Sequence, residues 1–367
     1  MRVLQLANGY LKNGLYKLLF AELEKNGIEE SVFLPVKNND TIPEKPSNVD
    51  IIPCFNSFDR ALFFRKQKKM MSWLEKNYEL PSFDIVHAHT VFSGGYAAYK
   101  IHKKYGTPYI VAVRNTDINT FFKYMVHLRK LGVEIMRNAD CVIFLSPAYM
   151  ENTLNKWVPA KHREEIRGKS RVIPNGIAPI FFENLASVKA APQDELKLIY
   201  VGDINSNKNP TLTIKAAEAL IAKGKKVSLK LIGSIKEEKY RQLINSRNFV
   251  MHIDRVPHDV IINHLKDSHI FVMPSHNETF GLVYAEAMSQ GLPVLYTRGQ
   301  GFDGHFEPGF VGYPISDYDE NDMIEKLGLV TASYSEISQN CVSAVSRFNW
   351  KDIAEEYVDI YKELKSN

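Results

Sequence analysis

Short apolar runs alternate with amphipathic stretches along the first half of the chain. Apolar residues recur at helical spacing between most of these runs, as in 15–27. Short apolar strands that alternate with helices are typical of a parallel sheet covered on both faces. The expected strands are 2–7, 31–36, 84–89, 109–114 and 141–146.

A second series of the same kind follows a turn-rich segment at 171–177, which contains Pro174 and an Asn-Gly pair. Its expected strands are 196–202, 228–233, 248–253, 269–274 and 292–297. A final helix is expected at 349–366, with one face formed by Ile353, Tyr357, Ile360, Tyr361 and Leu364. Two such series predict an α/β protein with two Rossmann-like, doubly wound parallel-sheet domains that face a cleft. The expected bounds are 1–172, to which a C-terminal helix at 350–367 packs back, and 173–349.

Composition agrees with two buried cores. Of the 367 residues, 45% are hydrophobic and 24% are charged, which excludes a disordered chain. The three cysteines lie far apart without a CxxC pair, which excludes a disulfide scaffold or a cysteine zinc site and suits a reducing compartment. No run of about 18 apolar residues and no signal peptide is present, so we expect a soluble, cytoplasmic protein.

Positive charge is concentrated in the first half. Residues 1–175 hold 26 Lys+Arg against 17 Asp+Glu, whereas 176–367 hold 20 against 25. Two segments, 58–77 and 121–138, mix basic and aromatic residues at helical spacing. They fit an amphipathic helix packed on its own sheet, or a basic face resting peripherally on anionic lipid at the inner side of a membrane. No motif for binding nucleic acid accompanies the charge.

The most informative segment follows the expected strand 269–274. It reads S-x-x-E-x-F-G-L-x-x-x-E-A-M-x-x-G-x-P-V over 275–294, with Glu278 in a loop and Glu286 inside a helix. We expect that helix to run from Phe280 to Gln290, capped by Thr279 and ended by Gly291. Ligands of parallel sheets bind beyond the carboxyl ends of the strands, and a helix start there favours anions. Carboxylates beside it suit hydroxyl groups.

This segment resembles the E-x7-E signature of retaining glycosyltransferases of family 4, which have the GT-B fold. The likeness extends to segments 87–89, 114–117, 173–177 and 201–210 and to the helix that starts at Trp350. It implies a nucleotide-sugar donor, with a UDP-sugar favoured over a GDP-sugar, bound mainly by the C-terminal domain. It also implies a hydroxyl acceptor on the N-terminal domain, such as a glycan or lipid-linked glycan in surface polysaccharide biosynthesis. Neither a metal nor a cofactor is expected.

The resemblance also implies roles for single residues. Lys208 would neutralise the departing diphosphate, Glu278 would hold the transferred sugar, and Glu286 would accept hydrogen bonds from the ribose. Further donor contacts would come from Gly14, Arg255 and Val256 and from the backbone of Phe280, Gly281 and Leu282. On the acceptor side the matching residues are His89, Arg114, Asn115 and Asp117.

One position departs from the family pattern. Asp203 stands where family members usually have an Arg, five residues before Lys208. A carboxylate beside a diphosphate is unfavourable, so we expect Asp203 to point away or to be compensated by another cation. The candidate cations are Arg114, Arg255 and Arg298.

Other interpretations stay open. Glu278 and Glu286 could be an ordinary loop acid and an exposed helix acid, and Lys208 a solvated loop lysine. His87 and His89 could suggest a metal pair, although no third ligand has suitable spacing, and Asp317 with Asp319 mimics the DxD motif in what we expect to be a surface loop. The glycine-rich segment 298–313 could contact ligand or simply form a loop. Alternative functions are a sugar-nucleotide epimerase and a non-catalytic sugar-binding subunit, whereas LANGYLKNG does not fit the G-x-G-x-x-G of a dehydrogenase.

Overall fold

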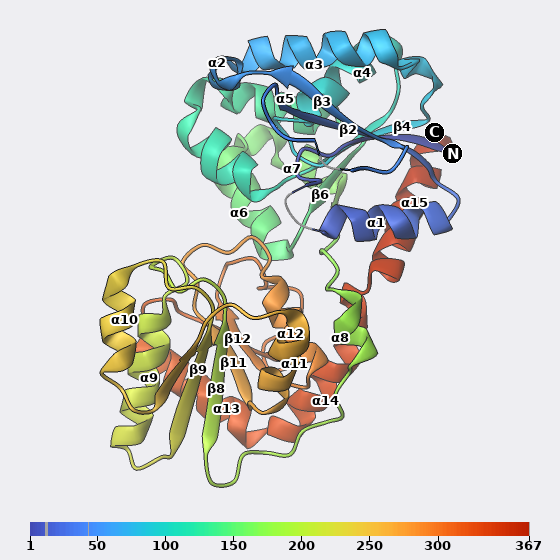
Figure 1. Ribbon diagram of the computed structural model, residues 1–367. Coiled ribbons are helices and arrows are strands. Elements are labelled where there is room, and N and C mark those ends of the chain that lie inside the picture. The colour runs from blue at the N-terminus through green and yellow to red at the C-terminus, as the bar shows by residue number, and fades with distance from the viewer. Residues whose placement is uncertain (12–13, 43, 367) are drawn as a thin grey trace. The chain divides into compact units, whose positions relative to one another are not determined.

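The computed structural model describes residues 1–11, 14–42 and 44–366 (Figure 1). The chain divides into two units. Unit 1 comprises Met1–Leu145, Met150–Pro174 and the chain from Trp350 onward. Unit 2 comprises Ser146–Tyr149 and Asn175–Asn349.

A parallel sheet forms the centre of unit 1. In the described residues it has seven strands, in the order β3-β2-β1-β4-β5-β6-β7. The strands are β1 (Arg2–Leu6), β2 (Glu29–Lys37), β3 (Val49–Phe55), β4 (Ile85–Ala88), β5 (Tyr109–Ala112), β6 (Cys141–Phe144) and β7 (Ser170–Val172). Residues 171–177, expected to be a turn-rich joint, thus begin within an edge strand.

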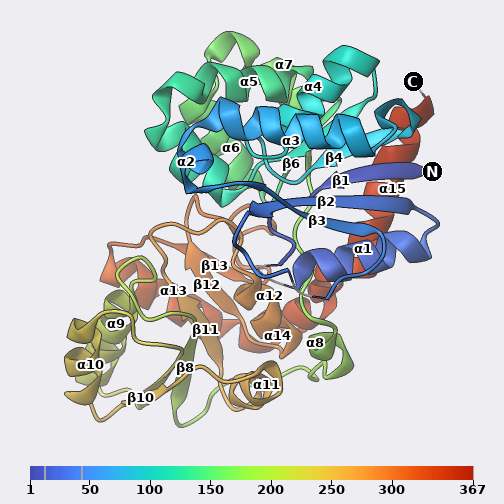
Figure 2. The same ribbon diagram turned by 45° about the horizontal axis from the view of Figure 1, so that its top comes forward.

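Helices cover both faces of this sheet. Figures 1 and 2 show α3 and α4 on one face and α1 with α15 on the other. The helices that belong wholly or mainly to unit 1 are α1 (Leu15–Lys25), α2 (Ser57–Ala61), α3 (Phe63–Asn77), α4 (Gly95–Tyr105), α5 (Arg129–Asn138), α6 (Pro147–Trp157), α7 (Ala160–Gly168) and α15 (Trp350–Ser366), with short turns η1 (Leu80–Ser82), η2 (Asp117–Phe122) and η3 (Val126–Leu128).

The last helix, α15, packs against unit 1 through the apolar face that its sequence predicts. Ile353, Tyr357 and Tyr361 are buried in one cluster with Leu19 and Leu23 of α1. Burial of each such side chain contributes about 1.5–3 kcal/mol, so this face fixes the helix to the sheet it covers.

The two basic, aromatic segments are more broken than their spacing predicts. Segment 58–77 divides into α2 and α3 at Leu62, whose backbone leaves the helical region (φ −102°, ψ 88°). Segment 121–138 begins in the π-helical turn η2, passes through η3 and becomes α-helical only at Arg129. In the part of the chain that the structure describes, no helix is both long enough and apolar enough to span a bilayer.

Unit 2 repeats the architecture around a second parallel sheet. Its six described strands lie in the order β10-β9-β8-β11-β12-β13. They are β8 (Leu196–Val201), β9 (Val227–Ile232), β10 (Val250–Ile253), β11 (Ile270–Met273), β12 (Val294–Thr297) and β13 (Gly312–Ile315). The helices are α8 (Pro179–Glu183), α9 (Pro210–Ala222), α10 (Glu238–Asn245), α11 (His258–Lys266), α12 (Leu282–Ser289), α13 (Glu320–Ala332) and α14 (Tyr334–Ala344), followed by the turn η4 (Val345–Phe348).

Candidate functional site

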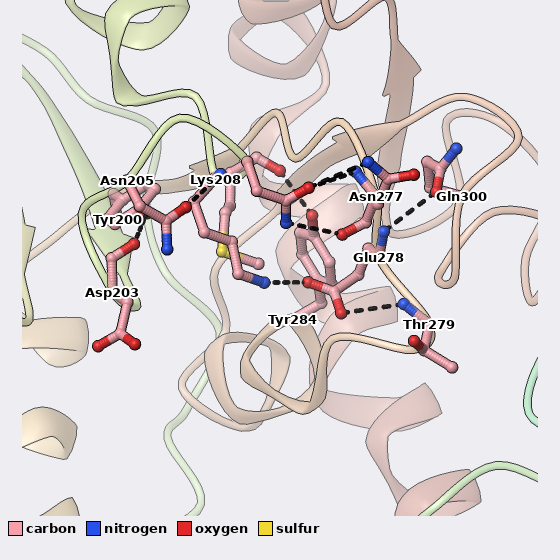
Figure 3. A network of polar contacts seen from close by, with 11 residues as sticks. Tyr200, Asp203, Asn205, Lys208, Asn277, Glu278, Thr279, Tyr284 and Gln300 are labelled. Carbon is pink, nitrogen blue, oxygen red and sulfur yellow. Dashed lines mark hydrogen bonds and ion pairs between the residues drawn. The ribbon is translucent and has the colours of Figure 1, made fainter. Parts of the chain in front are cut away.

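The candidate site lies at the carboxyl ends of the strands of unit 2. Strand β8 pairs with β9 on one side and with β11 on the other, which makes the β8–β11 boundary the topological switch point of this sheet. The loops that follow these two strands are joined by hydrogen bonds. The amide of His276 donates to the carbonyl oxygen of Asn207 (2.8 Å), and Nδ2 of Asn207 donates to the carbonyl oxygen of Asn277 (3.0 Å; Figure 3).

Asn205 and Asn209 fix the loop that carries Lys208. Its amide donates to Oδ1 of Asn205 (2.9 Å). Asn209 adopts a left-handed backbone conformation (φ 52°, ψ 51°), and its Nδ2 donates to the carbonyl oxygen of Asp317 (2.8 Å). Asparagine tolerates this conformation better than most residues. The loop therefore has a fixed shape before any ligand arrives.

Lys208 and Glu278 form an ion pair across the switch point (Figure 3). Both side chains are largely buried, with exposed fractions of 23% and 14%. The other carboxylate oxygen of Glu278 accepts from the amide of Thr279 (3.1 Å). The structure thus brings together the two residues for which the sequence predicts catalytic roles, although 70 positions separate them.

A second loop, after β12, supports Glu278 from its backbone. The amide of Glu278 donates to Oε1 of Gln300 (3.0 Å), and the amide of Gly301 donates to the carbonyl oxygen of Glu278 (2.9 Å). A Cβ at Gly301 would lie 2.3 Å from the backbone nitrogen of Phe280, so a side chain there would push the two loops apart. Part of the glycine-rich segment 298–313 is therefore a packing element of this site.

Helix α12 starts two residues later than predicted. It begins at Leu282, and its N-cap is Gly281 in a left-handed conformation (φ 80°, ψ 68°). The prediction that Thr279 caps this helix is therefore wrong. Phe280 lies outside the helix with its ring buried against Phe302 and Phe348. Glycine provides no side chain to cap the helix, so the first turn of α12 keeps the backbone donors and positive dipole end that bind anions.

Glu286, in the middle of α12, is a carboxylate without a partner. Among the described residues no hydrogen bond or ion pair reaches its side chain, and burial raises its pKa from 4.5 to about 7. The residue is partly exposed, so a ligand that donates hydrogen bonds can reach the carboxylate.

Asp203 is compensated by a residue that the sequence analysis missed. Nζ of Lys236, four positions after β9, lies 3.7 Å from Oδ1 of Asp203, and both side chains are about half exposed. Arg298 instead lies 3.5 Å from Asp322 of α13. The cation beside Asp203 is therefore Lys236 and not Arg298, whereas the expectations for Arg114 and Arg255 stay predictions.

Two of the residues expected to contact the donor follow β10. Arg255 is exposed and Val256 is half-buried, in the segment between β10 and α11.

The sequence could have indicated both missed residues, Lys236 and Gln300, because each stands within four positions of a strand's carboxyl end, where ligand-binding residues gather in such sheets.

The predicted acceptor residues lie in unit 1, and two of them are interior. Asp117 is fully buried, and its carboxylate accepts from the amides of Phe92 (3.1 Å) and Arg114 (2.9 Å). Burial raises its pKa to about 6. His89 is also fully buried, whereas Asn115 is exposed. Gly14 is the N-cap residue of α1, while its motif partner Asn13 lies outside the described residues.

The residues that imitate metal ligands have protein partners. Nδ1 of His87 lies 2.7 Å from the hydroxyl of Tyr361, and Nε2 of His89 lies 2.9 Å from Oε1 of Gln5. Asp319 caps α13, and Asp317 lies 2.7 Å from Nδ1 of His276. Across the described ranges, no group of three or more His, Cys, Asp or Glu residues could hold a metal ion.

Comparison with known families accounts for both units. Residues 17–179 match the family described as Glycosyltransferase Family 4, and residues 181–345 match Glycosyl transferases group 1. The chain belongs to glycosyltransferase family 4. This glycosyltransferase is 22% identical over 306 residues to D-inositol 3-phosphate glycosyltransferase of Acidothermus cellulolyticus, a match that covers 77% of this chain and 67% of that protein. The predicted family is confirmed.

Other proteins of known structure have the same fold as this glycosyltransferase. Sucrose-phosphate synthase of Thermosynechococcus elongatus is similar with a TM-score of 0.75 at 20% identity, covering 100% of this chain and 99% of that one. The lipopolysaccharide outer core galactosyltransferase WaaB has a TM-score of 0.73 at 16% identity (99% and 100% covered). Anabaena HepE in complex with UDP-glucose has a TM-score of 0.66 at 16% identity (99% and 100% covered). The predicted α/β GT-B fold is confirmed.

Proposed function

We propose that this glycosyltransferase moves a sugar from a nucleotide-sugar to a hydroxyl group, with unit 2 binding the donor. The observation that carries the proposal is the half-buried carboxylate of Glu286, which pairs with no described residue, one helix turn beyond an uncapped helix start. A ribose offers two adjacent hydroxyl donors to such a carboxylate, and a diphosphate suits the helix start. A UDP-sugar is the favoured donor, supported by the likeness to HepE bound to UDP-glucose.

Lys208 acts on the leaving group. As the bond between C1 of the sugar and the phosphate oxygen breaks, negative charge grows on the diphosphate, and the ammonium group stabilises it without a metal ion. Lys208 has three donors, so it can keep its contact with Glu278 and still reach a phosphate. Glu278 then orients the hydroxyls of the transferred sugar.

Retention follows if the acceptor attacks the face that the diphosphate leaves. The acceptor oxygen forms the new bond to C1, and its proton passes to the departing phosphate oxygen, so the mechanism needs no protein nucleophile. We propose a glycan or lipid-linked acceptor in surface polysaccharide biosynthesis, supported by the likeness to a lipopolysaccharide galactosyltransferase.

Hydrolysis of the donor tests this function without knowledge of the acceptor. The protein is incubated with UDP- and GDP-sugars while proton NMR follows the anomeric signals. With UDP-glucose we expect released UDP and α-glucose before β-glucose. A new donor isomer without nucleotide release would instead indicate an epimerase, and bound donor without any turnover would indicate a sugar-binding subunit.

We also propose that unit 1 touches anionic lipid through the surface around the α2–α3 corner and η2. Phe58, Phe64 and Tyr124 are 61%, 56% and 69% exposed. Basic groups accompany them, since Arg65 lies 5.4 Å from the ring of Phe58 and Lys123 lies 5.1 Å from that of Tyr124. Exposed aromatic rings with adjacent cations suit an anionic interface.

Vesicle binding at low salt tests this contact. Phe64→Ser should weaken sedimentation with phosphatidylglycerol vesicles, whereas the matched change Phe310→Ser, at an exposed phenylalanine of unit 2, should not. Equal binding of both variants and the wild type would refute the assigned surface.

A further inference from the structure

The two aspartates that imitate a DxD metal motif do different things in the structure. Asp319 is the N-cap of α13, where its carboxylate accepts from the amide of Asn321 (2.9 Å). The side chain of Asp317 is only 18% exposed, and its carboxylate lies 2.7 Å from Nδ1 of His276. Neither helix capping nor metal binding explains this placement of Asp317.

Asp317 contacts the two loops that carry Lys208 and Glu278. Its carbonyl oxygen accepts from Nδ2 of Asn209, the residue after Lys208 (2.8 Å). Its carboxylate accepts from His276, two residues before Glu278. In the sheet, β12 separates β13 from β11, and the loop after β13 reaches the switch point because α13 packs against α9. One residue therefore ties together the loops of the two predicted catalytic side chains.

The backbone of Asn209 shows why the Lys208 loop needs this tie. In the described ranges, Asn209 is the one residue other than glycine with a positive φ (52°). A left-handed conformation is less favourable than a right-handed one, and it persists where surrounding contacts hold it. The side chain of Asn209 does not cap α9 but donates to Asp317. The loop after β13 thus holds the turn from which Lys208 reaches Glu278.

The hydrogen-bond partners of His276 assign its tautomer and fix its ring. An ionised carboxylate accepts hydrogen bonds and donates none, so Nδ1 of His276 carries the proton that Asp317 accepts. The amide of His276 donates to the carbonyl oxygen of Asn207, the residue before Lys208 (2.8 Å). Its ring stacks on that of Tyr318, with the ring centroids 5.1 Å apart. His276 therefore joins the Lys208 loop to Asp317.

We infer that Asp317 and His276 are positioning residues of the transfer reaction and that they act through Lys208. Their hydrogen bond keeps Nζ of Lys208 where the leaving diphosphate gains charge. A small displacement of a group that acts in the transition state lowers turnover strongly, so loss of this bond should lower kcat more than it lowers affinity for UDP. The inference rests on the proposed function, because it extends the role assigned to Lys208.

Hydrolysis of UDP-glucose by single variants measures the effect. His276→Phe removes the Nδ1 donor but keeps a ring that can stack on Tyr318. It should lower kcat about tenfold and change UDP affinity in calorimetry by less than about twofold. His276→Asn places an N–H donor near the position of Nδ1 and should recover most of kcat. The matched control is His162→Phe in α7, which should change neither quantity, since Nδ1 of His162 also lies beside a carboxylate, that of Glu165 (3.4 Å).

Variants of Asp317 test the other side of the same bond. Asp317→Leu removes the acceptor and should lower kcat as much as His276→Phe does. Asp317→Asn keeps an acceptor oxygen for Nδ1 of His276 and should retain most of kcat. Equal losses of kcat in the leucine and asparagine variants would overturn the inference, because the hydrogen bond would then not be the feature that matters.

A double-mutant cycle tests whether the pair acts through Lys208. In a Lys208→Ala background, His276→Phe should cause little further loss of kcat, because the group that it positions is already absent. Equal loss in both backgrounds would indicate a merely structural role and overturn the inference, as would an unchanged kcat in the single variant His276→Phe. If Lys208→Ala left kcat unchanged, or the wild type released no UDP, the proposed function would fail first and the inference with it.

Discussion

The ionised carboxylate of Glu286 should lower the stability of the fold but strengthen donor binding. This half-buried carboxyl has no partner among the described residues, and desolvation raises its pKa from 4.5 to about 7. Below pH 4.5 the group is protonated in both the folded and the unfolded chain and has no effect. Between pH 4.5 and 7 the folded chain holds a proton that the unfolded chain has released, so stability falls as pH rises. Above pH 7 the penalty is complete.

The size of the penalty follows from the pKa. A rise from 4.5 to about 7 corresponds to about 3 kcal/mol as an upper bound. Glu286→Gln cannot ionise, so at pH 8 it should melt up to about 10 °C above the wild type, and at pH 4.5 the two should melt together. The same change should weaken UDP binding at pH 8 by about 1–3 kcal/mol, because charge-assisted hydrogen bonds to the ribose are lost.

Thermal melting at several pH values and calorimetry with UDP measure both effects. Glu325→Gln is the matched control, since Glu325 is an exposed residue of α13 beside Lys326 and should change neither quantity. A Glu286→Gln variant that is less stable than the wild type at pH 8, or that binds UDP equally well, would refute the reasoning.

Two further changes test the rest of the site. Lys208→Ala should lower kcat for donor hydrolysis more than it lowers UDP affinity, since the leaving group carries most charge in the transition state; equal losses in both would mean that Lys208 only binds. Gly301→Ala should lower the melting temperature because its Cβ would lie 2.3 Å from the backbone nitrogen of Phe280, whereas Gly328→Ala in α13, with open space around it, should be neutral or stabilising by up to about 1 kcal/mol. Equal melting of the two alanine variants would argue against the close loop contact.

The strands that the sequence missed lie at sheet edges. β3 contains Pro53 and β13 contains Pro314, and proline is tolerated at an edge because the ladder there needs fewer amide donors. In the sequence these prolines resemble turn signals. The central strands, buried on both faces, appear as uninterrupted apolar runs, which explains why they were predicted with bounds accurate to within about two residues.

The candidate site was predictable only in part. The rule that ligand residues follow strands identified Glu278 and Glu286, and the family resemblance added Lys208. The structure places the three on two loops and a helix of one sheet edge. The position of Lys236 after a strand could have been noticed, but its contact with Asp203 could not, because Lys236 follows a different strand and only the pairing of β8 with β9 brings the two together. That no described residue pairs with Glu286 is likewise a property of packing.

The central claim is that unit 2 holds a nucleoside diphosphate between Lys208 and the start of α12, with Glu286 on the ribose. A crystal structure of the protein with UDP tests it most directly. The account predicts a phosphate oxygen within hydrogen-bond distance of Nζ of Lys208 and both ribose hydroxyls on the carboxylate of Glu286. UDP bound elsewhere on the protein, with both side chains untouched, would contradict it.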